Sequence, residues 1–353
     1  MNNKKNIILL IVVILIFFIA FEIILRIFSY PVYGFSKGLF QTNDIIGYKL
    51  SSNYSGVQSI YGRTIKIETN SKGMRDFREY SYKRINKPRI LILGDSFSFG
   101  NSIELNESYV EYLRKNFNDN VEILNLAVPG YGVNNEYLSF INEDINYKPD
   151  VIILQFAIND WDSYKIIKQS GKEVIDKSNS FIANKDGYLV NEGEGTLRSI
   201  HLFLLTKLRF YSFIYSKSRL SLSSILNTFS KKNVPLHYFK EDSKEYQEAY
   251  NAYHLLLEKI KNNTQAKIIV FVGPSKEDFV KAEEIKEKYK LNYSIDTSQV
   301  KNSIKKITES LNLTFIEIKA DKPEIFLKVD GHWTPEENKK IANELYKSLK
   351  NEI

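Results

Sequence analysis

The sequence contains no cysteine and only four histidines, and each scarcity removes a class of chemistry. Without cysteine there can be no disulfide, no thiolate metal site, no cysteine nucleophile and no lipidated cysteine of the lipoprotein type. The histidines and carboxylates show no ligand spacing such as H-E-x-x-H, so we expect no metal and no cofactor. Any chemistry that needs an imidazole base must therefore use His201, His237, His254 or His332.

The chain also lacks a long run of one charge. It has 353 residues with 49 Lys and Arg against 42 Asp and Glu, a net charge of +7. Without residues 1–28 the balance is 46 against 41, or +5. Because Lys and Glu are interspersed, they indicate a solvated surface, and nucleic acid is not an expected partner. A hydrophobic content of 43% is enough for a sizeable packed core.

One long hydrophobic run is present, at residues 6–28, and it is apolar for fifteen residues before Glu22 and Arg26. It is long enough to cross a hydrocarbon core of ~30 Å, which takes about 20 residues. Glu22 and Arg26 lie four apart on one helical face and can pair near the membrane boundary. Lys4 and Lys5 precede the run, which predicts a cytoplasmic N-terminus and an extracytoplasmic remainder.

Two other interpretations of this segment fit less well. A cleaved signal peptide has a shorter apolar region, ~7–15 residues, and ends at a small-residue site. Here Ala20 is followed by Phe21 and Glu22. A buried core helix would not be apolar all round at the extreme terminus. The sequence therefore predicts an uncleaved transmembrane anchor.

Beyond the anchor, the sequence predicts a connector with short strands at 29–88 and a main domain at 89–353. Short, near-continuous apolar runs in the main domain predict parallel strands at 89–94, 121–128, 150–157, 266–273 and 313–318. Helical patterns lie at 105–117, 134–146, 242–262, 276–290, 301–311 and 335–350. This alternation predicts a doubly wound, three-layer α/β sandwich with a mainly parallel central sheet, preceded by the transmembrane helix.

An insertion at about 161–240 interrupts the alternation. Within it, "FIANKDGYLVNEG" predicts a hairpin that turns at "KDG". The aromatic and basic stretch at 197–220 predicts a helix. Packing of its apolar side on the core is the commoner arrangement, and a lid or membrane-facing helix within 197–230 is the alternative.

The segment "RILILGDSFSFG", residues 89–100, places Ser96 just after a predicted strand. It is not a P-loop, because Asn101 stands where G-x-x-x-x-G-K-[ST] requires lysine. It is not the G-x-S-x-G elbow either, because Ser98 occupies the second glycine position. What remains is a serine hydroxyl at the carboxyl edge of the sheet, where sites form in such folds. A serine nucleophile needs a base within about 3 Å.

Among the four histidines, only His332 has an evident partner in sequence. In "KVDGHWTPEEN", Asp330 precedes it by two residues and can hold one ring nitrogen, which leaves the other free to accept the serine proton. A turn-capping Asp330 beside a surface histidine is an equally good interpretation of this segment alone. His201 and His254 lie in helical stretches, and His237 follows "VPL" in a loop without an obvious partner.

Four separated blocks now resemble the SGNH/GDSL hydrolase superfamily, in particular its bacterial membrane-anchored members. They are "GDSF" (94–97), "NLAVPGYG" (125–132), "FAIND" (156–160) and "DGHW" (330–333), and the resemblance covers roughly residues 89–353. "TNSKGMRD" (69–76) is also similar to stretches of such anchored members.

The resemblance implies a role for one residue of each block and for the acid of the last. Ser96 would be the nucleophile, and its backbone N–H would be one oxyanion-hole donor. Gly130, through its backbone N–H, and Asn159, through its side-chain amide, would be the other two donors. His332 would be the general base and then the general acid, with Asp330 as its orienter.

The blocks depart from the family pattern in two places. Ala157 stands where a glycine is common, and the last block is D-x-H rather than D-x-x-H, which weakens the assignment of Asp330 more than that of His332. Gly132 is an alternative to Gly130, although the interval from the start of its block fits Gly130 better. The two remaining acids of the blocks are expected to bond loop backbones beside the site: Asp95 and Asp160.

Three functions follow as hypotheses. The first is a membrane-anchored, extracytoplasmic serine esterase that cleaves acyl esters, most plausibly O-acetyl groups, on a cell-envelope carbohydrate or another small ester. The second is an O-acyltransferase with the same triad, in which a sugar hydroxyl replaces water. The third is a membrane-tethered scaffold that no longer catalyses, because fold does not guarantee function. The expected partners are thus the ester substrate and, through residues 6–28, the membrane.

Overall fold

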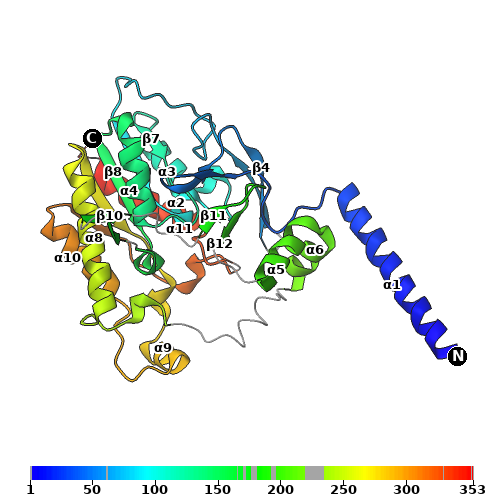
Figure 1. The fold of residues 1–353 in the computed structure, drawn as a ribbon. Helices are drawn as coiled ribbons and strands as arrows, with labels where there is room; N and C mark the ends of the chain where they lie inside the picture. Colours follow the sequence, from blue (N-terminus) through cyan, green and yellow to red (C-terminus); the bar gives the residue numbers. More distant parts are fainter. Residues whose placement is uncertain are drawn as a thin grey trace.

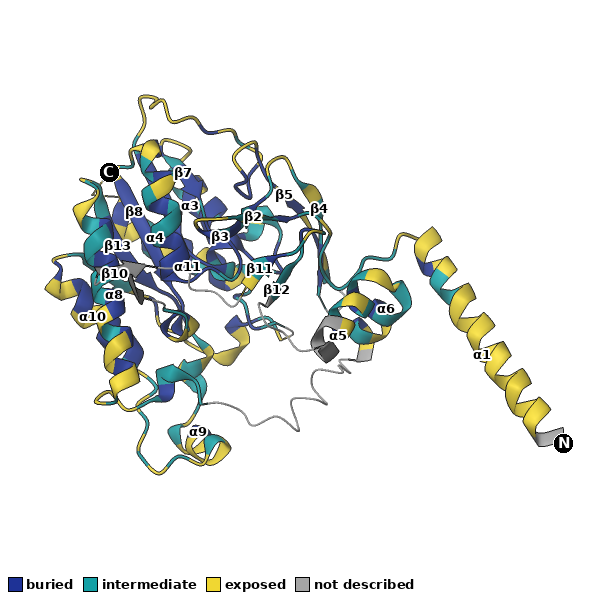
Figure 2. Cartoon of the chain, viewed as in Figure 1, coloured by how far each residue is buried: buried dark blue, intermediate teal, exposed yellow. Residues whose placement is uncertain are grey.

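The computed structural model describes residues 2–60, 63–164, 166–169, 172–175, 181–191, 196–218, 234–328, 330–350 and 352. Its N-terminal helix α1 (Asn2–Ile27) extends away from a rounded α/β domain (Figure 1). Helix α1 is exposed along almost its whole length, whereas the strands of the central sheet are buried (Figure 2). It is the one helix of the described chain that is long and apolar enough to cross a membrane, over Lys4–Ile27.

The five predicted strands of the main domain are all present and form one parallel sheet. They are β6 (Arg89–Leu93), β7 (Glu122–Asn125), β8 (Val151–Phe156), β13 (Lys267–Val272) and β14 (Thr314–Glu317). Their order in the sheet is β14-β13-β8-β6-β7, and every neighbouring pair is parallel. The chain therefore reverses its direction of travel across the sheet between β6 and β8, and such a switch point is where α/β sheets bind ligands.

Helices cover both faces of this sheet, which confirms the doubly wound sandwich. Ile90 and Ile92 of β6 pack on one side with residues of α3 (Tyr109–Asn116) and α11 (Pro335–Leu349). Leu91 and Leu93 pack on the other side with residues of α4 (Val133–Asn142), α8 (Lys244–Asn262) and α10 (Gln299–Ser310). Alternate side chains of one strand thus enter two separate cores, which explains why the central strands have nearly continuous apolar sequences.

The predicted connector, residues 29–88, contributes two small antiparallel sheets. One contains β1 (Gly34–Phe35), β4 (Ser55–Ile60) and β5 (Arg63–Glu68), and the other is a hairpin of β2 (Phe40–Asn43) and β3 (Gly47–Leu50). Side chains of these strands share a third apolar core with Phe99, Val128 and Tyr131 of the main domain. The connector is therefore packed against the loops that follow β6 and β7.

The predicted insertion contains a mixture of hairpins and helices. Strands β9 (Ile166–Gln169) and β10 (Lys172–Ile175) pair with each other, as do β11 (Phe181–Ala183) and β12 (Leu189–Asn191). The second pair confirms the hairpin predicted to turn at residues 185–187. The single helix predicted at 197–220 is instead two, α5 (Thr196–Lys207) and α6 (Arg209–Ser218), which break at Leu208. Residues 219–220 of that predicted helix, and 219–230 of the region considered as a lid, lie outside the described chain.

Candidate active site

Ser96 lies where the sheet changes direction, at the first residue of the short helix α2 (Ser96–Phe99) that follows β6. The preceding residue, Asp95, caps this helix, since its carboxylate accepts a hydrogen bond of 2.9 Å from the Phe97 backbone N–H. Asp160 likewise accepts a hydrogen bond of 2.8 Å from the Ala157 N–H. Both acids therefore bond loop backbones, as the sequence predicted.

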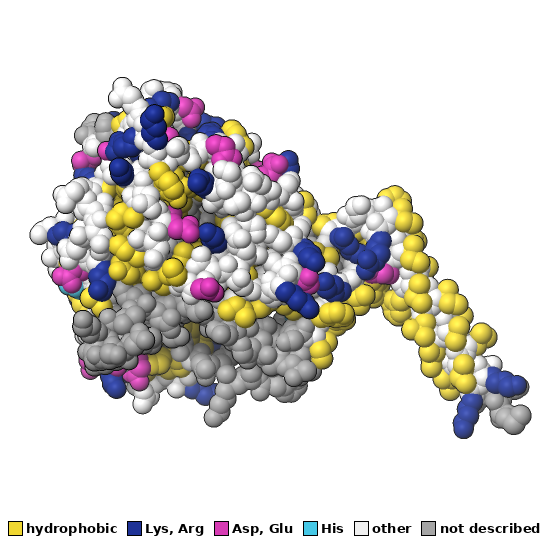
Figure 3. Space-filling model, turned by 45° about the horizontal axis from the view of Figure 1, so that its top comes forward, with side chains coloured by type: hydrophobic (Ala, Val, Ile, Leu, Met, Phe, Trp, Pro, Cys, Tyr) yellow, Lys and Arg dark blue, Asp and Glu magenta, His cyan; other side chains and the backbone are white. Residues whose placement is uncertain are grey.

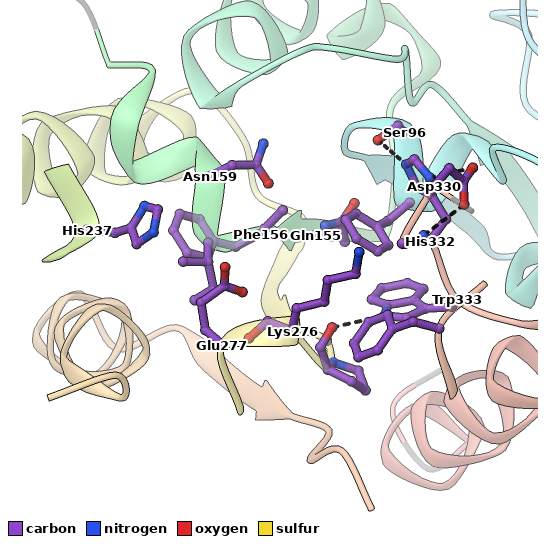
Figure 4. Close-up of a pocket in the computed structure, with 18 residues that line it drawn as sticks. Ser96, Gln155, Phe156, Asn159, His237, Lys276, Glu277, Asp330, His332 and Trp333 are labelled. Atoms are coloured by element: carbon purple, nitrogen blue, oxygen red, sulfur yellow. Dashed lines mark hydrogen bonds and ion pairs between the residues drawn. The ribbon is translucent and has the colours of Figure 1, made fainter. Parts of the chain in front are cut away.

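Ser96, His332 and Asp330 form one hydrogen-bonded chain (Figure 4). His332 Nε2 lies 2.8 Å from Ser96 Oγ, and His332 Nδ1 lies 3.0 Å from Asp330 Oδ2. The sequence separation between serine and histidine is 236 residues, so the fold alone brings them together. The geometry is that of a serine nucleophile, a base in reach of its proton and an acid that fixes the base.

Asp330 is held by three donors, although its D-x-H spacing is short. Besides the ring of His332, it accepts the His332 backbone N–H at 3.2 Å and the hydroxyl of Ser102. Burial opposes ionisation of this carboxyl, but these hydrogen bonds and the charge of His332 outweigh burial and lower the pKa of Asp330 below its ordinary value. Gly331 has φ +82°, a left-handed conformation that allows the sharp turn between the acid and the histidine.

The next residue, Trp333, anchors the loop that carries the acid and the histidine. Its indole N–H donates to the Pro274 carbonyl at 2.9 Å, and its ring packs on Phe97 with 4.5 Å between ring centroids. The backbone of Gly273 lies against the same ring, since a Cβ built there would come within 2.2 Å of it. Gly273 and Pro274, which follow β13, thus hold Trp333 in place and, through it, the neighbouring His332.

The connector supports the site from the other side. Arg75, which is fully buried, donates to the carbonyls of Phe99, Gly100 and Ile103 at 2.9, 2.6 and 2.8 Å. Gln58 accepts the backbone N–H of Ser102 at 2.8 Å. Together they hold the loop from which the Ser102 hydroxyl reaches Asp330. Sequence reasoning missed this support, because nothing in "TNSKGMRD" indicates which carbonyls its arginine will bind.

Ser96, His332 and Asp330 line a cavity of about 270 Å³. Asn159 also lines it, from the short helix η3 (Ile158–Asp162) after β8, so the structure brings together four of the five predicted site residues. Gly130 is not in the cavity wall. Its φ is +81°, and a Cβ built there would lie 2.9 Å from Tyr48 Oη and 3.3 Å from Leu189. The hairpin β11–β12 therefore lies directly beside Gly130, and its role as an oxyanion donor stays a prediction.

A second histidine–aspartate pair lines the same cavity and was missed from the sequence. His237 Nδ1 lies 2.7 Å from Asp162 Oδ2, and the His237 backbone N–H donates to Asp162 Oδ1 at 2.9 Å. The His237 side chain is only 10% exposed. His237 lines the cavity, and Asp162 binds one of its two ring nitrogens. The two residues are 75 positions apart, which hid this pairing, and "no obvious partner" was wrong for His237.

Two charged residues complete the wall, Lys276 and Glu277. In Figure 4 Glu277 lies beside His237 on one side of the cavity, while Ser96 and His332 lie on the other. The Lys276 ammonium lies close to the backbone of Gly331 and forms no ion pair with any described residue. The cavity thus presents a cation, an anion, an amide and an imidazole to a ligand, a set suited to hydroxyl-rich molecules.

Three buried carboxyl groups near the nucleophile have raised pKa values. Burial raises the pKa of Asp95 to about 6, and burial together with the Asp95 charge raises the pKa of Glu136 and of Asp160 well above the ordinary range. The raised pKa values favour the neutral form of Glu136 and Asp160. A neutral acid opposes the oxyanion of an acyl-transfer step less than a carboxylate does.

The family model for GDSL-like Lipase/Acylhydrolase matches residues 90–345, most of the chain and the whole of the site. The chain belongs to the GDSL-like lipase/acylhydrolase family. This GDSL-like hydrolase is accordingly a serine hydrolase that acts on ester bonds. A search of curated proteins gives no match.

Solved structures similar to this GDSL-like hydrolase have low sequence identity. An acetylxylan esterase from Geobacillus stearothermophilus is 13% identical, with a TM-score of 0.41 over 76% of this chain and 96% of that chain. TesA is 9% identical, with a TM-score of 0.41 over 75% and 99%. An α/β hydrolase from the metagenome of Lake Arreo is 11% identical, with a TM-score of 0.40 over 76% and 96%.

Proposed function

We propose that this protein is a membrane-anchored, extracytoplasmic esterase that removes acyl groups, in the first place O-acetyl groups, from a carbohydrate of the cell envelope. The observation that carries the proposal is the chain of hydrogen bonds from Ser96 Oγ through His332 to Asp330. It is made by residues at the switch point of the sheet and opens into a cavity whose wall combines polar and charged side chains with aromatic and aliphatic ones.

In the first step, Ser96 Oγ attacks the ester carbonyl carbon while His332 Nε2 takes the hydroxyl proton. The tetrahedral intermediate collapses when the bond to the alcohol oxygen breaks and His332 returns the proton to that oxygen. In the second step, water attacks the acyl-serine, again with His332 as base, and releases the acid and free Ser96. Asp330 stabilises the imidazolium form of His332 in both steps.

The carbonyl oxygen becomes an anion in each tetrahedral intermediate and needs donors. The backbone N–H of Ser96, at the start of α2, and the side-chain amide of Asn159 are available at the cavity wall. Gly130 is proposed as a third donor on the resemblance alone. Loss of one such donor typically costs ~10²–10³ in turnover.

The far side of the cavity would bind the alcohol part of the ester. There His237, oriented by Asp162, offers one ring nitrogen, and Lys276 and Glu277 offer a cation and an anion. Hydroxyl groups of a sugar can donate and accept, so they can bind all three. The small volume, about 270 Å³, suits a short acyl group and one sugar unit better than a long acyl chain.

The location rests on α1. Its predominantly apolar span of 24 residues, exposed in the structure, is long enough to cross a bilayer, and Lys4 and Lys5 at its start support a cytoplasmic N-terminus. The catalytic domain would then lie outside, next to the envelope polymers.

Covalent labelling of the full-length protein in detergent tests the proposal. A fluorophosphonate and an activated acetyl ester, followed by intact mass, should both modify the wild type. They should leave Ser96→Ala unmodified and modify His332→Ala at least about 10²-fold more slowly. Release of acetate from a sugar acetate into water supports the esterase, whereas transfer to an added sugar identifies an acyltransferase. A folded wild-type protein without any adduct would leave only the scaffold hypothesis.

A further inference from the structure

Helices α5 and α6 lie beside the C-terminal half of α1, at the place where α1 leaves the domain (Figure 1). Aromatic side chains join α6 to α1. The ring centroid of Phe210 lies 4.7 Å from that of Phe18 and 5.7 Å from that of Phe21. The ring centroid of Phe213 lies 5.6 Å from that of Phe21. All three contacts involve residues of α1 within its apolar span.

Polar contacts join the same elements. The Glu22 carboxylate of α1 accepts the backbone N–H groups of Arg209 and Phe210, at 3.2 and 2.8 Å, in the first turn of α6. Arg26 pairs with Glu22 at 2.7 Å and donates to the carbonyl of Lys207, at the end of α5, at 2.8 Å. An acid inside an apolar span is costly without partners, and here the start of α6 supplies them.

These contacts fix the position of α6 along the axis of α1. Glu22 is five residues and Phe18 nine residues before Ile27, the last residue of α1, which corresponds to about 8 and 14 Å along the helix axis. A hydrocarbon core of ~30 Å takes most of this 24-residue span. If α1 spans the bilayer, the first turn of α6 therefore lies at the level of the acyl chains or just above them.

The side chains that α5 and its junction with α6 expose are apolar, which suits a position at the depth of the acyl chains. Ile200 and Phe203, three residues apart on α5, are 45% and 58% exposed, and Leu208 at the junction is 37% exposed. In Figure 3 hydrophobic side chains cover α1 and continue onto the part of the domain next to it. Charged residues border this apolar surface, because the Asp186 carboxylate pairs with Lys37 at 2.8 Å and with Lys207 at 2.9 Å.

We propose that α5 and α6 are an interfacial platform, with Ile200, Phe203 and Leu208 among the acyl chains and glycerol groups of the outer leaflet. The occupant of this apolar surface is lipid, since the surface is continuous with the interface between α6 and a helix that lipid surrounds. An amphipathic element of this kind lies in the plane of the interface with its apolar face buried about 5–10 Å. The inference rests on the membrane anchor of the proposed function.

Because the chain has no cysteine, single cysteines can test this in the full-length protein in nanodiscs. Phe203→Cys and Leu208→Cys probe the platform, and Ile14→Cys probes the middle of α1. Lys347→Cys, with a side chain 65% exposed, probes the C-terminal helix, close to the chain end that Figure 1 shows far from α1. Each cysteine carries an environment-sensitive fluorophore, and lipids carry a nitroxide quencher near the headgroup or near the chain end. Fluorophosphonate labelling of Ser96 verifies that each variant is folded.

We expect the shallow quencher to reduce fluorescence at positions 203 and 208 roughly twofold or more relative to position 347. The deep quencher should act most strongly at position 14. Quenching at position 14 with values at 203 and 208 equal to those at 347 would overturn the platform and leave the anchor intact. Absence of quenching at position 14 would overturn the anchor and the platform together, while Ser96 labelling would still report on the esterase site.

Discussion

At the scale of single residues, Asp330 shows what a sequence can and cannot reveal about a site. Its pairing with His332 was predictable, because a single residue separates them and Gly331 permits the turn. The hydroxyl of Ser102, which also bonds Asp330, comes from 228 residues away and carried no signal in the sequence. His332 contributes most to the lowered pKa of Asp330, and the bond from Ser102 adds to it and helps to fix this D-x-H acid despite its departure from the family spacing.

His237 provides the prediction at this scale. In His237→Gln, kcat/KM for a glucose monoacetate, which keeps its other hydroxyl groups, should fall roughly 10–100-fold more than kcat/KM for 4-nitrophenyl acetate, which has no sugar to bind. The reason is loss of one hydrogen bond in a largely buried setting, on the order of 1–3 kcal/mol. Rates of acetate release for both esters give the ratio. Asp162→Asn, which frees the ring, should change the ratio in the same direction.

His254→Gln is the matched control, because His254 lies on α8 outside the cavity wall. It should leave the ratio unchanged. An equal fall for both esters in His237→Gln would mean that His237 only supports the fold, and no change would mean that the sugar does not reach it.

At the scale of elements, the connector is the part that the sequence predicted least well. Its short strands were expected, yet its role was not, because packing against Phe99 and the bonds from Arg75 depend on tertiary contacts. The five parallel strands were predictable for the opposite reason. A strand buried on both faces has a nearly continuous apolar run, as in β6 and β8, and such runs are rare elsewhere in the chain. No comparable pattern in the sequence predicts the break between α5 and α6 at Leu208.

Replacing Arg75 tests the support that the connector gives. Arg75→Met keeps the bulk but leaves three buried carbonyl groups without their donor, so the free energy of unfolding should fall by about 2–5 kcal/mol. Activity of the remaining folded protein should also fall, because the loop that carries Ser102 loses the hydrogen bonds from Arg75 that hold it in place. Urea denaturation and kcat/KM for 4-nitrophenyl acetate give the two values.

Arg63→Gln serves as the control in the same connector. Arg63 pairs with Glu107 at 2.7 Å on the surface, and such a pair contributes about 0–1 kcal/mol. Equal losses of stability in the two variants would contradict a special role for the buried guanidinium.

At the scale of the whole molecule, buried acids should make stability fall as pH rises. Asp144 is buried, bonded to the Ser139 hydroxyl at 2.6 Å, and burial raises its pKa from 3.8 to about 7. The native state therefore holds this proton more tightly than the unfolded chain. The stability from this group is fully present below pH 4 and is lost up to about pH 7, with a slope of about 1.4 kcal/mol per pH unit.

Asp144→Asn removes the titrating group and keeps the shape of the side chain. Its unfolding free energy should decline less between pH 4 and pH 7 than that of the wild type, so the two curves should diverge toward higher pH. Urea denaturation across this range gives both curves. Parallel curves would show that Asp144 has an ordinary pKa in the folded protein.

The junction between α1 and the domain has one more consequence. Glu22 and Arg26 bond to the ends of α6 and α5, and Tyr30 lies 3.1 Å from the Ser216 hydroxyl, so the residues after α1 are not a free tether. A catalytic domain on a flexible tether would take up a wide range of positions around its anchor and reach distant polymers. If α1 spans a membrane as proposed, a domain that is clamped in this way drifts only sideways with its anchor, and its cavity stays at a fixed height above the lipid. Esters within that height are in reach, and those farther out must be carried to it.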